Sequence, residues 1–372
     1  MKLVRRTLLT LSLALALALS NLVPAFAIPQ LLVDMRTGEV LFENEAGVPW
    51  HPASLTKLMT ALLAFEAIQS GQISLSTPVI TSANALSVPP SKLGLPEGTA
   101  MTMQDALYAL IVKSANDIAV AIAETVGGTE ERFVQMMNAR AAEMGMTATH
   151  YVNPHGLHDP AQVTSARDLA ILALTIRARY PQYDAIFSTE SVTHGGARME
   201  SNNILLSKFL GTDGMKTGYV CASGLNIVAT AARNGRHLMA ITLGASSARE
   251  RGEMTAQMLF SGFAGGYRGT GTSIVALTNS AGLAPVDMRP LICGANAPDY
   301  NEARMEEFPL GLDGELSYLT DDLTPPSYSL AVLGRLRNVP LPRPRPSGMP
   351  AAPTYAAGGF DETLEPDRKF GG

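Results

Sequence analysis

The chain is poor in charge, in cysteine and in aromatic residues, and these shortages exclude several classes of protein. Of its 372 residues, 16% are charged, 6% are aromatic and 2 are cysteines. So few cysteines exclude a small scaffold held by disulfides, and a hydrophobic content of 46% excludes a wholly disordered chain. No basic tract is present to neutralise phosphates, so we expect no nucleic acid as a partner. The length predicts two domains.

The first 27 residues have the three regions of a secretory signal peptide. Three basic residues fall within the first six, a Leu/Ala run covers residues 8–19, and an A-x-A sequence ends at Ala27. This order predicts cleavage after Ala27, because the run is shorter than the ~20 residues that a membrane-spanning helix needs. Arg5-Arg6 also suits twin-arginine export, so the export route stays open. We expect a periplasmic or otherwise extracytoplasmic protein with a net charge of -8, since the segment removes three positive charges from a total of -5.

Cys221 and Cys293 would therefore meet an oxidising compartment, where a pair of cysteines can persist as a disulfide. Such a bond would close a loop of about 72 residues and stabilise the fold by roughly 4 kcal/mol. Two buried free thiols are the alternative. Sequence leaves both open because it does not fix the geometry of the pair.

Hydrophobic spacing predicts an α/β protein of the α+β type, with an antiparallel sheet flanked by helices and a helical lobe inserted between its halves. A hairpin over residues 30–43 opens the fold, a helix begins at Ser54, and Asn234-Gly235 predicts a second hairpin. The other expected elements are helices over residues 102–112, 117–126, 130–144, 166–177 and 250–263, and strands over residues 225–231 and 236–243.

The pattern weakens beyond residue 270. We expect a main domain over residues 28–270 and a small C-terminal region of uncertain fold over residues 271–339. Residues 340–372 begin with six prolines in fourteen positions, which predicts a disordered tail of extended polyproline geometry.

The sequence contains none of the common motifs for binding a metal or a nucleotide. The six histidines form no HExxH sequence, and the chain has neither CxxC nor GxxxxGK[ST]. His155 and His158 have a spacing that could bind a metal, but they lie in a segment that predicts a turn. We therefore expect no metal and no cofactor.

Three short motifs can carry chemistry together: S-x-x-K at residues 54–57, S-x-N at residues 114–116 and K-T-G at residues 216–218. Each is weak alone, since S-x-N also occurs at residues 82–84 and 201–203. The copy at 114–116 lies between two apolar helices, where a polar loop can present side chains across a cleft.

Ser54 and Lys57 are one helical turn apart, so the amine can reach the hydroxyl. A serine nucleophile needs a base, and a lysine serves only if burial or a second cation keeps it partly neutral. Lys216 could be that cation. The alternative is an ordinary helix cap at Ser54 and a solvated lysine.

The K-T-G segment can bind a substrate along a strand edge. Gly218 leaves room for a substrate backbone, Thr217 offers a hydroxyl to a carboxylate, and the N–H of Tyr219 could join that of the Ser54 region as an oxyanion donor. The alternative is a turn rich in Gly and Thr.

The ordered triple resembles the signature of penicillin-recognising enzymes with an active-site serine. With its flanks at residues 52–60, 114–117 and 213–219, it is similar to low-molecular-weight penicillin-binding proteins, the D-alanyl-D-alanine carboxypeptidases. Further matches at residues 33–41, 153–157 and 164–170 extend the resemblance over about residues 30–265. It implies a β-lactamase/transpeptidase-like fold, a peptidoglycan stem peptide as substrate and β-lactam antibiotics as inhibitors.

The resemblance also implies residue roles. Ser54 would attack the carbonyl between the last two D-alanines, and Lys57 would take its proton. Ser114 would relay a proton to the leaving amine, and Asn116 would hold the substrate amide. For the binding residues, Lys216 would tune the field, and Thr217 with Arg249 would hold the terminal carboxylate.

Three other functions have to be weighed against the sequence. A class A β-lactamase needs a Glu after S-x-N, and residues 153–168 contain none. An endopeptidase of the same family that cuts peptide crosslinks is not excluded, and a non-catalytic wall-binding protein would not need Ser54 and Lys57. The family commonly has a β-rich second domain and a membrane-binding C-terminal helix, but residues 271–339 do not match the first and the tail lacks the apolar face of the second.

Overall fold

The computed structural model describes residues 27–335, which belong to one compact unit. Residues 1–26 of the predicted signal peptide and the whole predicted tail lie outside the described residues. Within residues 27–335, no helix is both long and apolar enough to cross a membrane.

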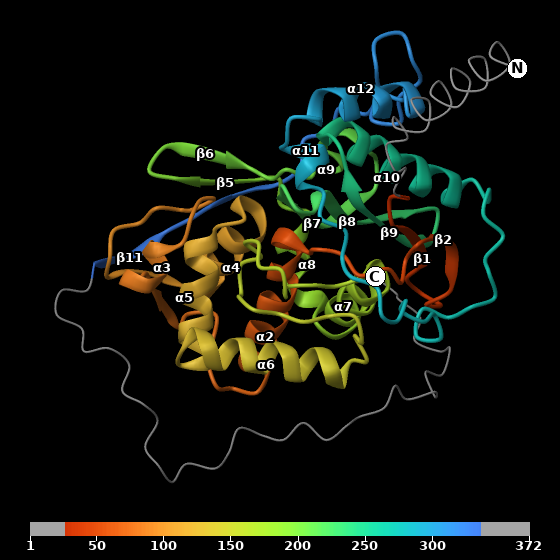
Figure 1. Ribbon diagram of the computed structural model, residues 1–372. Coiled ribbons are helices and arrows are strands. Elements are labelled where there is room, and N and C mark those ends of the chain that lie inside the picture. Colours follow the sequence, from red (N-terminus) through yellow and green to blue (C-terminus); the bar gives the residue numbers. More distant parts are fainter. Residues whose placement is uncertain (1–26, 336–372) are drawn as a thin grey trace, which may run out of the picture. The chain divides into compact units, whose positions relative to one another are not determined.

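A five-stranded antiparallel sheet forms the centre of the fold, in the order β2-β1-β9-β8-β7 (Figure 1). Its strands are β1 (Gln30–Asp34), β2 (Val40–Asn44), β7 (Thr212–Val220), β8 (Gly224–Arg233) and β9 (Arg236–Ala245). The two predicted hairpins are confirmed. Among residues 27–335, β7 has a neighbouring strand on one side, and no strand of this part of the chain pairs with its other edge.

The turn between β8 and β9 is the one that its sequence predicts. Asn234 and Gly235 both have positive φ, 51° and 74°, and they connect the paired residues Arg233 and Arg236. Asn and Gly tolerate this left-handed conformation, which matches the twist of a two-residue hairpin.

Helices cover both faces of the sheet because the apolar residues of the strands alternate. Leu31 packs with the cluster that includes α7 (Ala166–Arg179), whereas its neighbour Leu32 packs with the cluster that includes α10 (Ala248–Phe263). Successive strand side chains point to opposite faces. The sheet therefore lies between α7 and α10.

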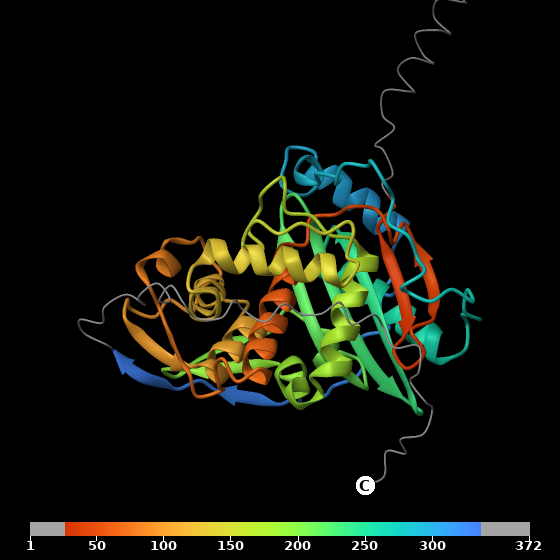
Figure 2. The same cartoon turned by 90° about the horizontal axis from the view of Figure 1, so that it is seen from below.

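The predicted helical lobe is present and is built around α2 (Lys57–Gln69), whose residues are almost all buried. Around it lie α4 (Met103–Tyr108), which continues as a π-helical turn over Ala109–Lys113, α5 (Asn116–Gly127) and α6 (Glu130–Glu143). In Figure 2, the red-orange α2 lies between the yellow helices of the lobe and the green strands of the sheet.

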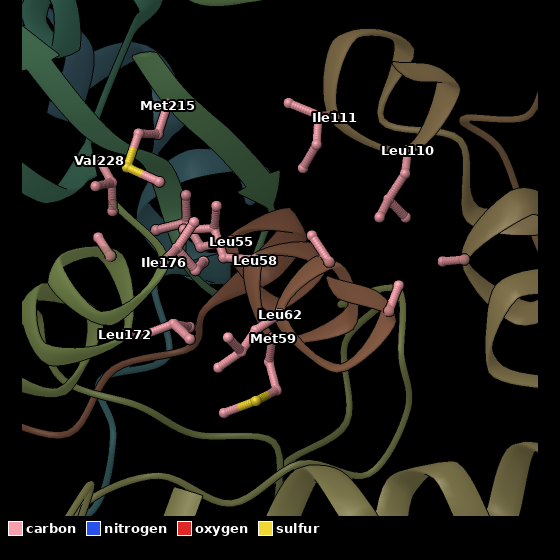
Figure 3. Packing of buried hydrophobic residues seen from close by; sticks show 14 of the residues in the cluster. Leu55, Leu58, Met59, Leu62, Leu110, Ile111, Leu172, Ile176, Met215 and Val228 are labelled. Carbon is pink, nitrogen blue, oxygen red and sulfur yellow. The ribbon is translucent and has the colours of Figure 1, made fainter. Parts of the chain in front are cut away.

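The core is continuous between lobe and sheet. Figure 3 shows Leu55 and Leu58 beside Ile176, Met215 and Val228, and all five belong to one buried cluster. The segment that carries the S-x-x-K motif is therefore fixed by packing against both halves of the protein.

Short elements complete the fold. Residues 82–84, for which the sequence predicts a loop, begin the short helix α3 (Ala83–Ser87), where the Ser82 hydroxyl accepts a hydrogen bond from Ala85 N–H. The remaining helices are α8 (Asp184–Ser188), α9 (Leu205–Lys208), α11 (Arg289–Ile292) and α12 (Ala297–Glu307), and the remaining strands are β3 (Pro78–Ile80), β4 (Thr99–Thr102), β5 (Ser191–His194), β6 (Ala197–Glu200), β10 (Ser327–Ser329) and β11 (Val332–Arg335).

The described residues after 270 do not form a region apart from the main domain. Strand β10 adds to β5–β6, and β11 adds to β3–β4, so the C-terminal segment, drawn in blue in Figure 1, completes both small sheets. Arg304 of α12 donates to the buried carboxylate of Glu250 on α10 with an Nε–Oε1 distance of 2.7 Å. The predicted boundary at residue 270 therefore separates no compact units. Hydrophobic periodicity could not reveal this, because the segment after residue 270 is held by contacts with residues far away in the sequence.

Candidate active site

Ser54 lies in a 3₁₀ turn over Ala53–Thr56, and the α-helix begins only at Lys57. The sequence predicts an α-helix from Ser54 onward, so the first turn is tighter than expected. In a 3₁₀ turn, side chains three residues apart eclipse each other. The Lys57 amine is consequently 3.0 Å from the Ser54 hydroxyl.

Lys57 is fully buried, and its amine lies among three oxygen atoms. Nζ is 2.8 Å from Oδ1 of Asn116, 2.5 Å from the carbonyl oxygen of His155 and 3.0 Å from Ser54 Oγ. Burial lowers the pKa of Lys57 well below its ordinary value, and the charge of Lys216 lowers it further, while Asp117 opposes the shift.

These contacts fit a neutral amine that serves as a base. A neutral lysine amine has two N–H groups and one lone pair. The two N–H groups can donate hydrogen bonds to Asn116 Oδ1 and to the His155 carbonyl, which leaves the lone pair for the Ser54 hydroxyl. Proton transfer from Ser54 to Lys57 therefore needs no rearrangement of either side chain.

The segment around His155, which the sequence predicts as a turn, forms part of this site. Gly156 has φ +90°, and a Cβ there would lie 1.9 Å from the carbonyl oxygen of Ala53, so only glycine fits against the Ser54 turn. Burial, and then the charge of Lys57, lower the pKa of His155 to about 3, which keeps its ring neutral. The contribution of the His155 carbonyl has no signal in the sequence, because a backbone oxygen is the same in every residue.

Of the three S-x-N sequences, the one at residues 114–116 forms the loop beside Ser54. Its Ser114 and Asn116 lie on the same cavity wall as Ser54. Ser114 ends the π-helical turn in the left-handed conformation with φ 62°, and Asn116 begins α5. Asn116 Nδ2 donates to the carbonyl of Pro89 at 2.9 Å, which fixes the direction of the amide. Its Oδ1 atom therefore faces Lys57.

The K-T-G sequence lies in the nine-residue edge strand β7 rather than in a turn. A Cβ at Gly218 would lie 2.9 Å from the backbone N of Ser54, so glycine lets the strand approach the Ser54 turn closely. Lys216 is buried, and its amine donates to the carbonyl of Thr217 at 3.1 Å. Burial, and then the charge of Arg251, lower the pKa of Lys216 to about 7.

The three motifs line one cavity of about 380 Å³, the active-site cavity. The motif residues on its wall are Ser54, Ser114, Asn116, Thr217, Gly218 and Tyr219. Lys57 and Lys216 are not on this wall but are buried beside its residues, at 3.0 Å from Ser54 and 3.1 Å from Thr217 respectively. Arg251 is the arginine on this wall.

The expected role of Arg249 needs correction. Arg249 points to the C-terminal segment, where its guanidinium donates to the carbonyls of Phe308, at 2.9 Å, and Leu310. Residues two apart on a helix point in nearly opposite directions, so Arg249 and Arg251 of α10 cannot serve the same site. The sequence did not single out Arg251, because the motif match does not show which side of α10 faces the cavity.

Arg251 is a buried cation with spare hydrogen-bonding capacity. It is 4% exposed, and it donates through Nη2 to the carbonyl of Asn202 at 2.6 Å. Its Nε is buried, and no acceptor within the described part of the chain reaches it. Burial lowers the pKa of Arg251 to about 10, so the guanidinium stays charged at neutral pH.

The two cysteines form a disulfide at the end of β7. The Cα atoms of Cys221 and Cys293 are 5.7 Å apart, and no free cysteine occurs among the described residues. The structure thereby decides between the two possibilities that the sequence leaves open.

Comparison with known sequences identifies the family. The sequence model of peptidase family S11, described as D-alanyl-D-alanine carboxypeptidase, matches residues 25–247. The chain belongs to this family. It is 36% identical over 235 residues to D-alanyl-D-alanine carboxypeptidase DacD of Escherichia coli, and 34% identical over 236 residues to DacF of Bacillus subtilis. The first match covers 61% of each chain, and the second covers 61% of this chain and 60% of the relative, so the similarity spans about three-fifths of these carboxypeptidases.

Two solved structures to which this chain is similar confirm the predicted fold class. Penicillin-binding protein 6B of Escherichia coli matches with a TM-score of 0.61 and 35% identity, covering 63% of this chain and 76% of that chain. Penicillin-binding protein D2 of Listeria monocytogenes, solved in its ampicillin-bound form, matches with a TM-score of 0.57 and 28% identity, covering 64% of this chain and 99% of that chain.

Proposed function

We propose that this family S11 protein is a serine-type D-alanyl-D-alanine carboxypeptidase that removes the terminal D-alanine from peptidoglycan stem peptides. The observation that carries the proposal is the contact at 3.0 Å between the buried amine of Lys57 and Oγ of Ser54, which lies on the wall of a cavity that is also lined by Arg251.

Acylation would begin with the neutral amine of Lys57. It accepts the proton of Ser54 while Oγ attacks the carbonyl carbon between the two D-alanines. The negative charge that develops on the carbonyl oxygen would be stabilised by the backbone N–H groups of Ser54 and Tyr219. Support for this pairing comes from the close approach of β7 to the Ser54 turn at Gly218.

Release of D-alanine requires a proton on the leaving nitrogen. Ser114 lies on the cavity wall, and we assign its hydroxyl to relay the proton that Lys57 took from Ser54 to this nitrogen, which leaves Lys57 neutral and Ser114 protonated. Asn116 Oδ1 accepts from Lys57 at 2.8 Å and keeps a second lone pair for the substrate amide. Water then hydrolyses the acyl-enzyme and restores Ser54.

The terminal carboxylate would bind to Arg251 and Thr217. Nε of Arg251 has no acceptor among the described residues, an anion would stabilise this buried guanidinium, and a carboxylate matches its planar donors. Lys216 lies next to Thr217 in β7 and adds positive charge at the same end of the cavity. An endopeptidase that cleaves crosslinks is the alternative within family S11.

A β-lactam would acylate Ser54 by the same route. Residues 153–168 contain no Glu of the kind that a class A β-lactamase uses to activate water, so we expect slow deacylation. We also propose export through a signal peptide cleaved after Ala27, which places the enzyme at the cell wall outside the cytoplasm. The domain division that we now propose is a signal peptide, one catalytic unit that includes residues 271–335, and a proline-rich tail.

The test uses purified protein without residues 1–27. It is incubated with diacetyl-Lys-D-Ala-D-Ala and, separately, with a crosslinked dimer peptide. Release of D-alanine from the first alone supports the carboxypeptidase, and cleavage of the dimer alone supports the endopeptidase. The mechanism is wrong if a Ser54→Ala variant still forms a stable adduct with labelled penicillin.

A further inference from the structure

The end of β7 that lines the active-site cavity is tied covalently to the C-terminal segment. Tyr219 and Val220 lie on the cavity wall, and Cys221 follows them directly. The disulfide joins Cys221 to Cys293, which follows α11 and is 72 residues further along the chain. A segment beyond the part of the chain that matches family S11 therefore reaches the active site.

The contact between this segment and the β7–β8 turn extends beyond the disulfide. Met288 N–H donates to the carbonyl of Ala222 at 3.0 Å, and Met288 is 1% exposed. Its sulfur lies so close to Gly224 that a Cβ there would be 2.9 Å from it. Residues 288–293 thus hold the turn at two points, Ala222 and Cys221.

Tyr219 lies between the disulfide and the cavity. Its hydroxyl is 3.2 Å from Sγ of Cys293 and 3.8 Å from Sγ of Cys221. The side chain is 50% exposed, so packing alone does not fix it. The backbone of Tyr219 belongs to an edge strand that, among the strands that the structure describes, pairs only with β8.

An edge strand held on one side needs a second restraint if its backbone is to act as a fixed donor. Groups that stabilise an oxyanion work because they are already in place when the charge develops. At the Gly218 end of the segment, the restraint is the contact with the Ser54 turn. At the Cys221 end, the restraint is the disulfide.

We propose that the Cys221–Cys293 disulfide is a positioning element of the active site, which holds the backbone N–H of Tyr219 opposite that of Ser54. Reduction of the bond lowers the rate of Ser54 acylation while carboxylate binding at Arg251 is retained. This inference rests on the proposed function, because it assigns the Tyr219 N–H to the oxyanion.

The test compares the oxidised protein with a Cys221→Ser/Cys293→Ser double variant. D-Alanine release from diacetyl-Lys-D-Ala-D-Ala gives kcat and KM, and labelled penicillin gives the rate of Ser54 acylation. We expect kcat and the acylation rate to fall by about 10-fold or more, because sub-ångström placement of reacting groups carries factors of this size. KM should change by less than about threefold.

Dithiothreitol reduces the Cys221–Cys293 disulfide reversibly and so tests the same loss without a substitution. It should lower the acylation rate of the oxidised protein to that of the double variant, and removal of the reductant with reoxidation should restore it. The double variant, treated in parallel, is the control for effects of the reagent that do not involve this bond.

Loss of the crosslink also lowers stability, so each rate is measured at least 10 °C below the melting temperature of the variant. Wild-type kcat and acylation rate in the folded double variant would overturn the proposal, and so would a rise in KM at constant kcat. If the oxidised protein reacts with penicillin but releases no D-alanine, the proposed function fails, while the acylation rates still decide the role of the disulfide.

Discussion

Gly218→Ala tests whether the close approach of β7 to the Ser54 turn is required for catalysis. The new Cβ would lie 2.9 Å from Ser54 N, 3.0 Å from Pro52 O and 3.1 Å from Ala53 Cβ. Two of these atoms belong to the backbone and cannot rotate away. To reach the ordinary contact distance of 3.4 Å from Ser54 N, the strand and the turn must separate by about 0.5 Å.

Both stability and activity should respond to this separation. Overpacking of a buried contact costs about 1–3 kcal/mol of unfolding free energy. A shift of about half an ångström between Ser54 and the N–H of Tyr219 should lower kcat/KM by about 10-fold or more. The Cβ also covers the N–H of Ser54, which removes an oxyanion donor.

Thermal unfolding and acylation by labelled penicillin measure the two effects. Gly262→Ala in α10 is the matched control, because its Cβ would meet only side-chain ends, the methyl groups of Leu238 and Leu32 at 2.8 and 2.9 Å. It should leave acylation unchanged. The reasoning is refuted if Gly218→Ala reacts at the wild-type rate and unfolds at the wild-type temperature.

Three further predictions follow from the buried charges. Arg251→Met should lower kcat/KM for D-alanine release by about 100-fold, mainly through KM, because the terminal carboxylate loses its buried partner. Lys216→Met should move the acidic limb of the pH profile of kcat/KM to higher pH: Lys57 must be neutral to act as a base, and the charge of Lys216 lowers its pKa. Arg304→Met should lower the unfolding free energy by about 3 kcal/mol, measured with denaturant, because it leaves the carboxylate of Glu250 buried without its ion pair.

Each of these variants has a defined control. Arg251→Lys keeps the positive charge without the planar donors and should recover part of the lost kcat/KM, and equal losses in both variants would contradict a contribution of this charge to carboxylate binding. A shift of the acidic limb to lower pH in Lys216→Met would contradict the coupling to Lys57. Arg198→Met removes an exposed ion pair with Glu190 and should change stability little, so an equal effect of Arg304→Met would contradict the burial argument.

Sequence determined the features that depend on neighbouring residues. Asn234-Gly235 fixes its hairpin because the turn conformation is a property of those two residues. The side chains of Ser54 and Lys57 are in contact because residues three apart in a helical turn lie on the same side. The motif order identified the family, since such a combination of residues serves a specific chemistry.

Tertiary structure decided everything that depends on contacts between distant segments. It selected Arg251 over Arg249 because the position of α10 relative to β7 determines which side of the helix faces the cavity. It gave Lys57 the carbonyl of His155 as a partner, and it joined Cys221 to Cys293. The described residues after 270 gave no periodic signal because they pack as single strands and short helices on elements far away in the chain. Local patterns therefore determined the chemistry of this protein, and long-range packing determined which groups surround it.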